Sequence, residues 1–167
     1  LLDCGMVQGD RMADERNAAD FPFDPKSIDA LVLSHAHIDH TGRVPLLVKR
    51  GFAGPIFTHP ATIDLAVIML ADSANVATID AEHDNRHLQP GQRPSVLLYT
   101  QDDVDAATKL MRPIAYDAPT EILPGVQVTL RDAGHILGSA TVEIAADEQV
   151  DQTRTTRKLV FTGDLGP

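Results

Sequence analysis

The segment SHAHIDHTG, from Ser34 to Gly42, constrains the fold of this chain more than any other. It holds three of the seven histidines, His35, His37 and His40, together with Asp39. The apolar run in IDALVLS, just before it, has the length of a buried strand. Residues at i and i+2 of an extended segment project to the same side, so His35 and His37 can bind one metal ion from the strand end. After the chain turns, Asp39 and His40 can face a second ion.

The spacing of this cluster suits a two-metal site. Two catalytic metal ions lie about 3.5–4 Å apart, and a short turn between two ligand pairs is a compact way to reach that distance. Neutral imidazoles and ionised carboxylates are the groups that must converge on such ions. Three histidines at these offsets are improbable as a chance event in an acidic chain that has only seven.

Other His and Asp residues follow predicted strands elsewhere in the chain. His135 lies in RDAGHILGSA, between glycines where the backbone can bend tightly. Asp164 ends the apolar strand LVFTGD, and Asp3 ends the apolar pair of LLDCG. Taken singly, His135 has a structural explanation and the two aspartates can be turn residues before glycine. Together with the histidine cluster they give four strand ends that present His or Asp, as expected of an α/β active site at a sheet edge.

The order of the predicted elements indicates a mixed α/β fold. Apolar residues recur at spacings of three and four over residues 61–82, which predicts the longest helix. Residues 83–94 are polar and interrupted by Pro and Gly, which predicts a loop or a frayed helix end. Thr100, followed by acidic residues, predicts the start of another helix. Residues 147–157 are expected to form a flexible hairpin loop between two strands.

The composition narrows the classes of partner. The net charge of −10 disfavours sequence-independent nucleic-acid binding by charge alone. Bound divalent metals would nevertheless reverse the field around an active site. No apolar run reaches the ~18 residues that a membrane span needs, so no membrane partner is expected.

The remaining candidate residues have structural explanations. Cys4 is the single cysteine; it excludes an internal disulfide, suits a reducing cytosol and is predicted to pack at a strand end rather than act as a nucleophile. His83 and His87 stand four residues apart and could bind a metal from a helix. The sequence supplies no third ligand near them, so an exposed position is predicted. His59 is predicted to cap a helix or form a turn.

Four motifs resemble those of the metallo-β-lactamase superfamily. HxHxDH resembles its second motif, and LLDCG, GHILGSA and FTGDLG resemble its first, third and fourth. The segments ATIDLAVIMLADSANV, LYTQDDVDAATKLMRPIAYD and GHILGSATVEI look like the β-CASP nucleic-acid hydrolases. Within these, the chain is similar to the bacterial and archaeal RNA-processing enzymes that resemble the endonuclease subunit of the eukaryotic mRNA 3′-end cleavage machinery. The resemblance runs from residue 1 to residue 167.

The resemblance implies an αββα sandwich, of which residues 1–167 would be the N-terminal portion of the metallo-β-lactamase domain. The strands upstream of LLDCG would precede this chain, and the β-CASP domain is expected after residue 167. In the family, the insert carries a histidine thought to help the leaving group, and a histidine beyond it completes the second zinc site. Residues 1–167 alone are therefore expected to lack these two histidines. Incomplete metal binding or inactivity of this segment by itself would be consistent with that absence.

Carried over residue by residue, the resemblance implies two zinc ions. Their ligands would be His35, His37 and His135 for the first ion, Asp39 and His40 for the second, and Asp164 as the bridge. Asp3 would orient a ligand histidine by hydrogen bonding, and Asp39 would also handle a proton of the attacking water. The catalytic residues would thus be Asp39 and Asp3.

The implied function is a cytoplasmic, zinc-dependent ribonuclease. A water activated by two metals would hydrolyse phosphodiester bonds of single-stranded RNA, from an end or internally. One alternative is a hydrolase of the same superfamily that acts on small substrates, such as thioesters or lactams. The sequence of residues 61–116, which resembles the β-CASP enzymes, argues against this alternative. Another is an inactive scaffold that binds RNA, although every ligand this segment should carry is present. A homodimer is compatible with each of them.

Overall fold

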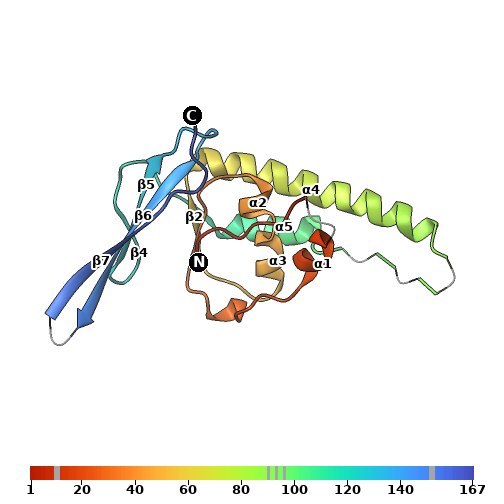
Figure 1. Cartoon of the computed structure of the whole chain (residues 1–167), viewed down its shortest axis with the longest axis horizontal. Coiled ribbons are helices and arrows are strands. Elements are labelled where there is room, and N and C mark those ends of the chain that lie inside the picture. The colour runs from red at the N-terminus through yellow and green to blue at the C-terminus, as the bar shows by residue number, and fades with distance from the viewer. Residues whose placement is uncertain (10–11, 90, 93, 96, 151–152) are drawn as a thin grey trace.

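The computed structural model describes residues 1–9, 12–89, 91–92, 94–95, 97–150 and 153–167. Helices and strands are both present, as predicted, and Figure 1 shows their arrangement. The helices are α1 (Ala13–Ala18), the 3-10 helix η1 (Pro25–Ser27), α2 (Ile38–Thr41), α3 (Val44–Lys49), α4 (Pro60–Arg86) and α5 (Gln101–Leu110). The strands are β1 (Leu31–Val32), β2 (Ile56–Thr58), β3 (Met111–Pro113), β4 (Thr120–Leu123), β5 (Val126–Asp132), β6 (Ala140–Val150) and β7 (Thr153–Phe161).

The strands form two sheets of different kind. The first sheet is parallel, in the order β1-β2-β3, and Leu2 adds a parallel bridge to Val32 of β1. The second is antiparallel, in the order β4-β5-β6-β7. Because the strands of the first sheet run the same way, the segments that follow them leave from one edge. The HxHxDH segment follows β1 and therefore starts at this edge.

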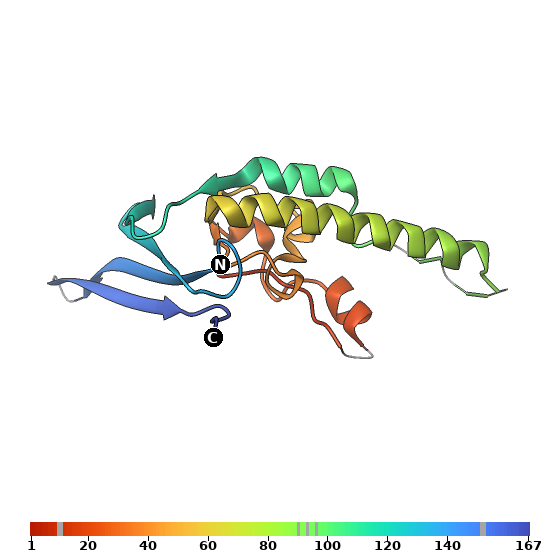
Figure 2. The same ribbon diagram turned by 90° about the horizontal axis from the view of Figure 1, so that it is seen from above.

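Two hydrophobic clusters show how the layers are stacked. Leu31 and Leu33 pack into a cluster with residues of α3, α4 and α5, whereas Val32 packs with Val128 and Val142 of the second sheet. Neighbouring residues of a strand point to opposite faces, so the first sheet lies between the helices and the second sheet. The order is helices, sheet, sheet, which supplies three layers of the expected αββα sandwich. In the described part of the chain, no helix covers the outer face of the second sheet (Figure 2).

The hairpin of β6 and β7 corrects one expectation from the sequence. A flexible loop was expected over residues 147–157, but strand pairing continues from Val142 opposite Phe161 to Val150 opposite Thr153. Thr155 and Thr156 are β-branched and favour an extended backbone, which the polarity of the stretch obscured. The residues at the turn, 151–152, lie outside the described residues. The result is a long two-stranded ribbon that extends away from the helices (Figure 1).

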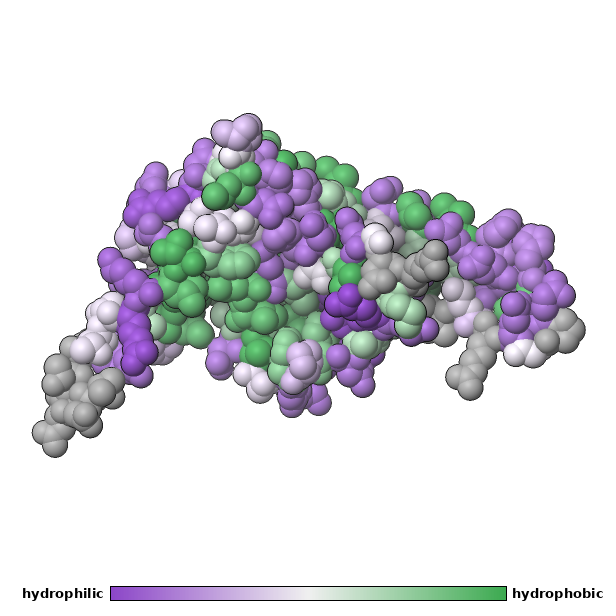
Figure 3. Space-filling view, viewed as in Figure 1, coloured by the Kyte–Doolittle hydropathy of each residue, from purple (hydrophilic) through white to green (hydrophobic). Residues whose placement is uncertain are grey.

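Helix α4 is longer than predicted, with 27 residues rather than the stretch 61–82. Its first half packs on the core through the buried residues Thr62, Ala66, Leu70 and Ala74. Its second half runs beyond the core, and apolar surface lies along that edge of the molecule (Figures 2 and 3). By length and composition α4 could cross a membrane, contrary to the expectation from the sequence. One such helix is weak evidence for a membrane span, because core helices pass the same test.

Candidate metal centre

A tight turn at the end of β1 builds one side of the site. After β1 the chain bends at Ser34 and reaches His37, which is the N-cap residue of the one-turn helix α2. The hydroxyl of Thr41 donates to the carbonyl oxygens of Ala36 and His37, both at 3.0 Å, and this fixes the turn. Two ligand-type side chains therefore lie before the turn, and Asp39 and His40 lie after it on α2.

Three imidazole rings, from two distant parts of the chain, converge on one point. Nε2 of His35 lies 3.1 Å from Nδ1 of His37, and Nε2 of His135 lies 3.2 Å from the same Nδ1. Oδ2 of Asp164 lies 3.9 Å from Nε2 of His35 and 3.6 Å from Nε2 of His135. Ligand atoms about 2.0–2.1 Å from a tetrahedral metal ion are themselves roughly 3.3 Å apart. The spacing of these four groups therefore fits a single metal ion.

A second group of donors lies next to the first. Nε2 of His40 is 3.3 Å from Oδ1 of Asp164 and 4.0 Å from Oδ2 of Asp39. The rings of His35 and His40 are 4.1 Å apart between centroids, so the two groups are adjacent. Asp164 presents one carboxylate oxygen to each group. A carboxylate in this position can bind two ions at once, as expected for a two-metal site.

Asp3 is fully engaged by hydrogen bonds. Its Oδ1 accepts from the backbone N–H of Ser34 at 2.7 Å, and its Oδ2 accepts from the Ser34 hydroxyl at 2.6 Å. The same Oδ2 lies 2.6 Å from Nδ1 of His40. Asp3 also lies close to His35, but its oxygens already have partners. Its hydrogen bond to Nδ1 leaves the other ring nitrogen of His40 free to face Asp164, as the sequence resemblance implies for Asp3.

Burial shifts the ionisation of the innermost groups. His35 is fully buried. This burial, with smaller contributions from the rings of His40 and His37, lowers the pKa of His35 to about 4. The ring is therefore neutral near pH 7, which is the form that binds a metal. Burial also raises the pKa of Asp3 above its ordinary value, while the hydrogen bonds from Ser34 and His40 oppose the shift.

The structure brings together all seven site residues that the sequence suggested. They are Asp3, His35, His37, Asp39, His40, His135 and Asp164. His59 stays outside this group and is the N-cap of α4, where its Nδ1 accepts from the N–H of Ala61 at 3.3 Å, as predicted. Two supporting residues, Thr62 and Ser139, carry no signal in the sequence, because their partners are distant in the chain or are backbone atoms.

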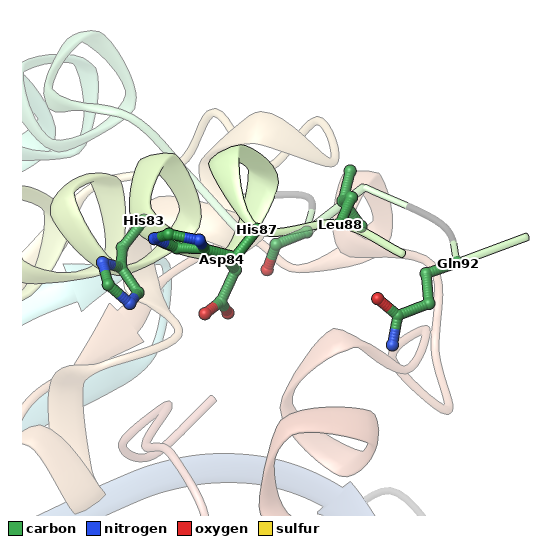
Figure 4. A pocket seen from close by; sticks show the side chains of 6 residues that line it. His83, Asp84, His87, Leu88 and Gln92 are labelled. Carbon is green, nitrogen blue, oxygen red and sulfur yellow. The ribbon is translucent and has the colours of Figure 1, made fainter. Parts of the chain in front are cut away.

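His83 and His87 lie at the far end of α4, with ring centroids 4.7 Å apart. They border an open hollow of about 500 Å³ together with Asp84, Leu88 and Gln92 (Figure 4). Both histidines are exposed, as predicted. In the described stretches of the chain, they do not join a group of three ligand atoms close enough to share one ion.

Cys4 is expected to be unreactive in the folded protein. Its side chain is 8% exposed, and burial raises the pKa of its thiol to about 12. Only the thiolate reacts quickly with alkylating reagents, so modification at pH 8 should be slow in buffer and fast in denaturant. Because Cys4 is the only cysteine, mass spectrometry after iodoacetamide treatment measures the rate of its alkylation directly. Equal rates in buffer and in denaturant would contradict the packing.

Comparisons with known proteins agree with this geometry. The family model of the metallo-beta-lactamase superfamily matches residues 1–62. The chain is 39% identical over 166 residues to Ribonuclease TTHA0252 of Thermus thermophilus, covering 99% of this chain and 32% of the ribonuclease. It is 32% identical over 169 residues to the transcription termination factor FttA of Methanosarcina mazei, covering 98% of this chain and 23% of FttA. The chain thus spans a third or less of the length of these curated relatives.

A solved structure shows the same fold. It is a class B3 metallo-beta-lactamase with an active-site glutamic acid, and it matches 95% of this chain and 50% of its own with a TM-score of 0.50. The sequence identity of 18% makes this a likeness of fold alone. The family match, the relatives and the fold agree with the four sequence motifs, and the chain belongs to the metallo-beta-lactamase superfamily.

Proposed function

We propose that this chain carries the metal centre of a β-CASP ribonuclease that hydrolyses single-stranded RNA. The observation that carries the proposal is the position of Asp164, whose two carboxylate oxygens face two adjacent groups of donors. The names of two relatives, a ribonuclease and a transcription termination factor, point to RNA rather than to a small substrate.

The donor set fits zinc. Imidazole nitrogens and carboxylate oxygens are the ligands that zinc takes in catalytic sites. We assign His35, His37 and His135 to one ion, Asp39 and His40 to a second, and Asp164 to both. When bound, such ions lower the pKa of a water molecule and balance the charge that develops on a phosphate.

The residues of the chain have separate tasks in this proposal. Asp3 holds the ring of His40, and the buried His35 stays neutral as a ligand. Asp39 and Asp164 have side chains that are 49% and 44% exposed, so the site opens to solvent on their side. A phosphodiester would approach from there, and Asp39 would take up a proton from the attacking water at its carboxylate.

The same relatives support two further parts of the proposal. We place the β-CASP domain after residue 167, because the chain spans only 32% of the ribonuclease that it resembles. We place the protein in the cytoplasm, where RNA-processing and transcription factors of prokaryotes act. A homodimer stays compatible with these proposals.

The test is cleavage of labelled single-stranded RNA by the full-length protein, with and without a chelator, beside two variants. We expect cleavage that requires both metal and Asp39, so that Asp39→Ala is inactive. His87→Ala serves as the matched control and should cleave normally, because His87 lies outside the donor groups. Cleavage that persists in Asp39→Ala would contradict the assignment. A protein loaded with zinc that leaves RNA intact would contradict the substrate and direct the search to thioesters and lactams.

A further inference from the structure

The position of His135 depends on contact between the two sheets. His35 and His37 follow β1 of the first sheet, whereas His135 lies in the loop between β5 and β6 of the second. Nε2 of His135 nevertheless lies 3.2 Å from Nδ1 of His37. Metal sites tolerate deviations of only about 0.2 Å in ligand distance. The loop that carries His135, residues 133–139, must therefore be fixed relative to the first sheet and its helices.

Thr62, in the first turn of α4, is bonded to this loop. Its hydroxyl donates to the carbonyl oxygen of Gly138 at 2.7 Å, across 76 residues of chain, and its side chain is fully buried. A threonine in a helix usually donates to the carbonyl four residues earlier, as Thr78 of the same helix does to Ala74 at 2.8 Å. For Thr62 the residue four positions earlier is Thr58 of β2, which precedes the N-cap residue His59, so no carbonyl of α4 is available to its hydroxyl. The Thr62 hydroxyl instead donates to the loop.

The helix and the loop approach too closely for a side chain between them. Gly138 has φ +83°, and a Cβ there would lie 2.6 Å from both the backbone nitrogen and the hydroxyl of Thr62. The neighbouring Ser139 receives a second contact, because the Tyr116 hydroxyl donates to its carbonyl oxygen at 2.7 Å. The ring of Tyr116 stacks on His59, the N-cap residue of α4, with centroids 4.1 Å apart.

Ser139 connects this part of the loop to His135 by hydrogen bonds. Its hydroxyl oxygen accepts from the backbone N–H of His135 at 3.1 Å and from that of Ile136 at 3.2 Å. The loop backbone on either side of the hydroxyl is thus tied to Thr62 and Tyr116 at one end and to His135 at the other.

We propose that Thr62 is a positioning residue for the metal ligand His135, with Tyr116 as its partner. The proposal rests on the assignment of His135 as a ligand under the proposed function. Removal of the Thr62 hydroxyl leaves the Gly138 carbonyl without its donor and releases the loop at its closest contact with α4. His135 then samples positions outside the range that the metal tolerates. Hydrogen bonds that orient metal ligands typically change metal affinity by about 10–100-fold when lost.

The experiment measures zinc affinity in the full-length protein by competition with a chromophoric chelator. Thr62→Val keeps the shape of the side chain and removes its donor, and it should weaken one zinc site about tenfold or more. Thr62→Ser keeps the donor and should bind as the wild type does. Thr78→Val removes a hydroxyl that bonds only within α4 and should also leave affinity unchanged. Tyr116→Phe should weaken the same site in the same direction.

A melting curve of the metal-free protein separates positioning from general stability. A purely structural role would lower the melting temperature of Thr62→Val with no change in zinc affinity, and this result would overturn the inference. If Thr62→Val does not fold, the zinc affinity of Tyr116→Phe tests the inference instead. Wild-type zinc affinity in Tyr116→Phe would then overturn the inference. A wild-type protein that binds no zinc would overturn the proposed function and the inference with it. Unchanged affinity in the variants of a zinc-binding wild type overturns the inference alone.

Discussion

His37→Ala is expected to abolish hydrolysis of RNA while the fold is retained. Nδ1 of His37 is the atom shared by the contacts to His35 and His135, so its loss removes the centre of the three-imidazole group. A bound metal stabilises the transition state by several kcal/mol, and each 1.36 kcal/mol is a factor of ten. Activity should fall by roughly 10³-fold or more. The check is the cleavage rate of labelled RNA at saturating zinc.

The fold should survive this change because the His37 side chain does not cap α2. The turn is held instead by the Thr41 hydroxyl on two backbone carbonyls, and these bonds do not involve the imidazole. Far-UV circular dichroism of the metal-free variant should match that of the wild type. His83→Ala is a suitable control, since it removes an exposed histidine at the far end of α4. Cleavage by His37→Ala within a few fold of the wild type would refute the two-metal assignment.

Gly5→Ala is expected to destabilise the protein and to disturb the second donor pair. A Cβ on Gly5 would lie 1.5 Å from the carbonyl oxygen of Asp39 and 2.6 Å from the backbone nitrogen of His40. Backbone atoms cannot rotate away as a side chain can, so either α2 or the segment of Gly5 must move. Overpacking costs up to about 3 kcal/mol, which corresponds to a melting temperature lower by roughly 6–12 °C at this chain length.

The movement also reaches Asp39 and His40, the proposed ligands of the second ion. The N–H groups of Cys4 and Met6 donate to the carbonyl oxygens of His40 and Ile38 at 2.8 and 2.9 Å, so Gly5 lies directly against α2. We expect Gly5→Ala to lose part of its zinc content, measured by elemental analysis after dialysis. Gly9→Ala is the comparison, because Gly9 has φ +72° and open space around it. That variant carries only the left-handed strain of about 1–2 kcal/mol and should keep its zinc. A Gly5→Ala protein with the wild-type melting temperature and zinc content would disprove the close contact.

The sequence was informative where local spacing decides geometry. His35 and His37 are two residues apart just after the predicted strand, so the sequence predicts a common direction for their side chains, and their rings do converge although β1 ends at Val32. Asp39 and His40 come after the chain turns, as expected, but the one-turn helix α2 that carries them was not predicted. His135 and Asp164 could be identified because polar residues at strand ends are few and are flanked by glycine. Asp3 was placed beside a ligand histidine by resemblance alone.

The sequence was uninformative where a contact joins distant segments. The Thr62 hydroxyl finds its acceptor 76 residues away, because Thr62 lies in the first turn of α4, where no helical carbonyl precedes it. The length of α4 and of the β6–β7 hairpin was underestimated for another reason. Both continue through polar residues that are exposed and carry no burial pattern, so hydrophobic periodicity stops before the backbone hydrogen bonds do.

The division of the donors between two sheets has a consequence for folding. His37 and His135 are separated by 98 residues; His37 follows β1 of the first sheet, and His135 lies in the loop between β5 and β6 of the second. An ion held between them, as proposed, would cross-link the two halves of the sandwich and close a long loop of chain. Folding and metal uptake would then be thermodynamically linked, since an ion that binds only the native state stabilises it in proportion to the logarithm of its free concentration. The cellular supply of zinc would in this way set how long the protein persists as well as how fast it works.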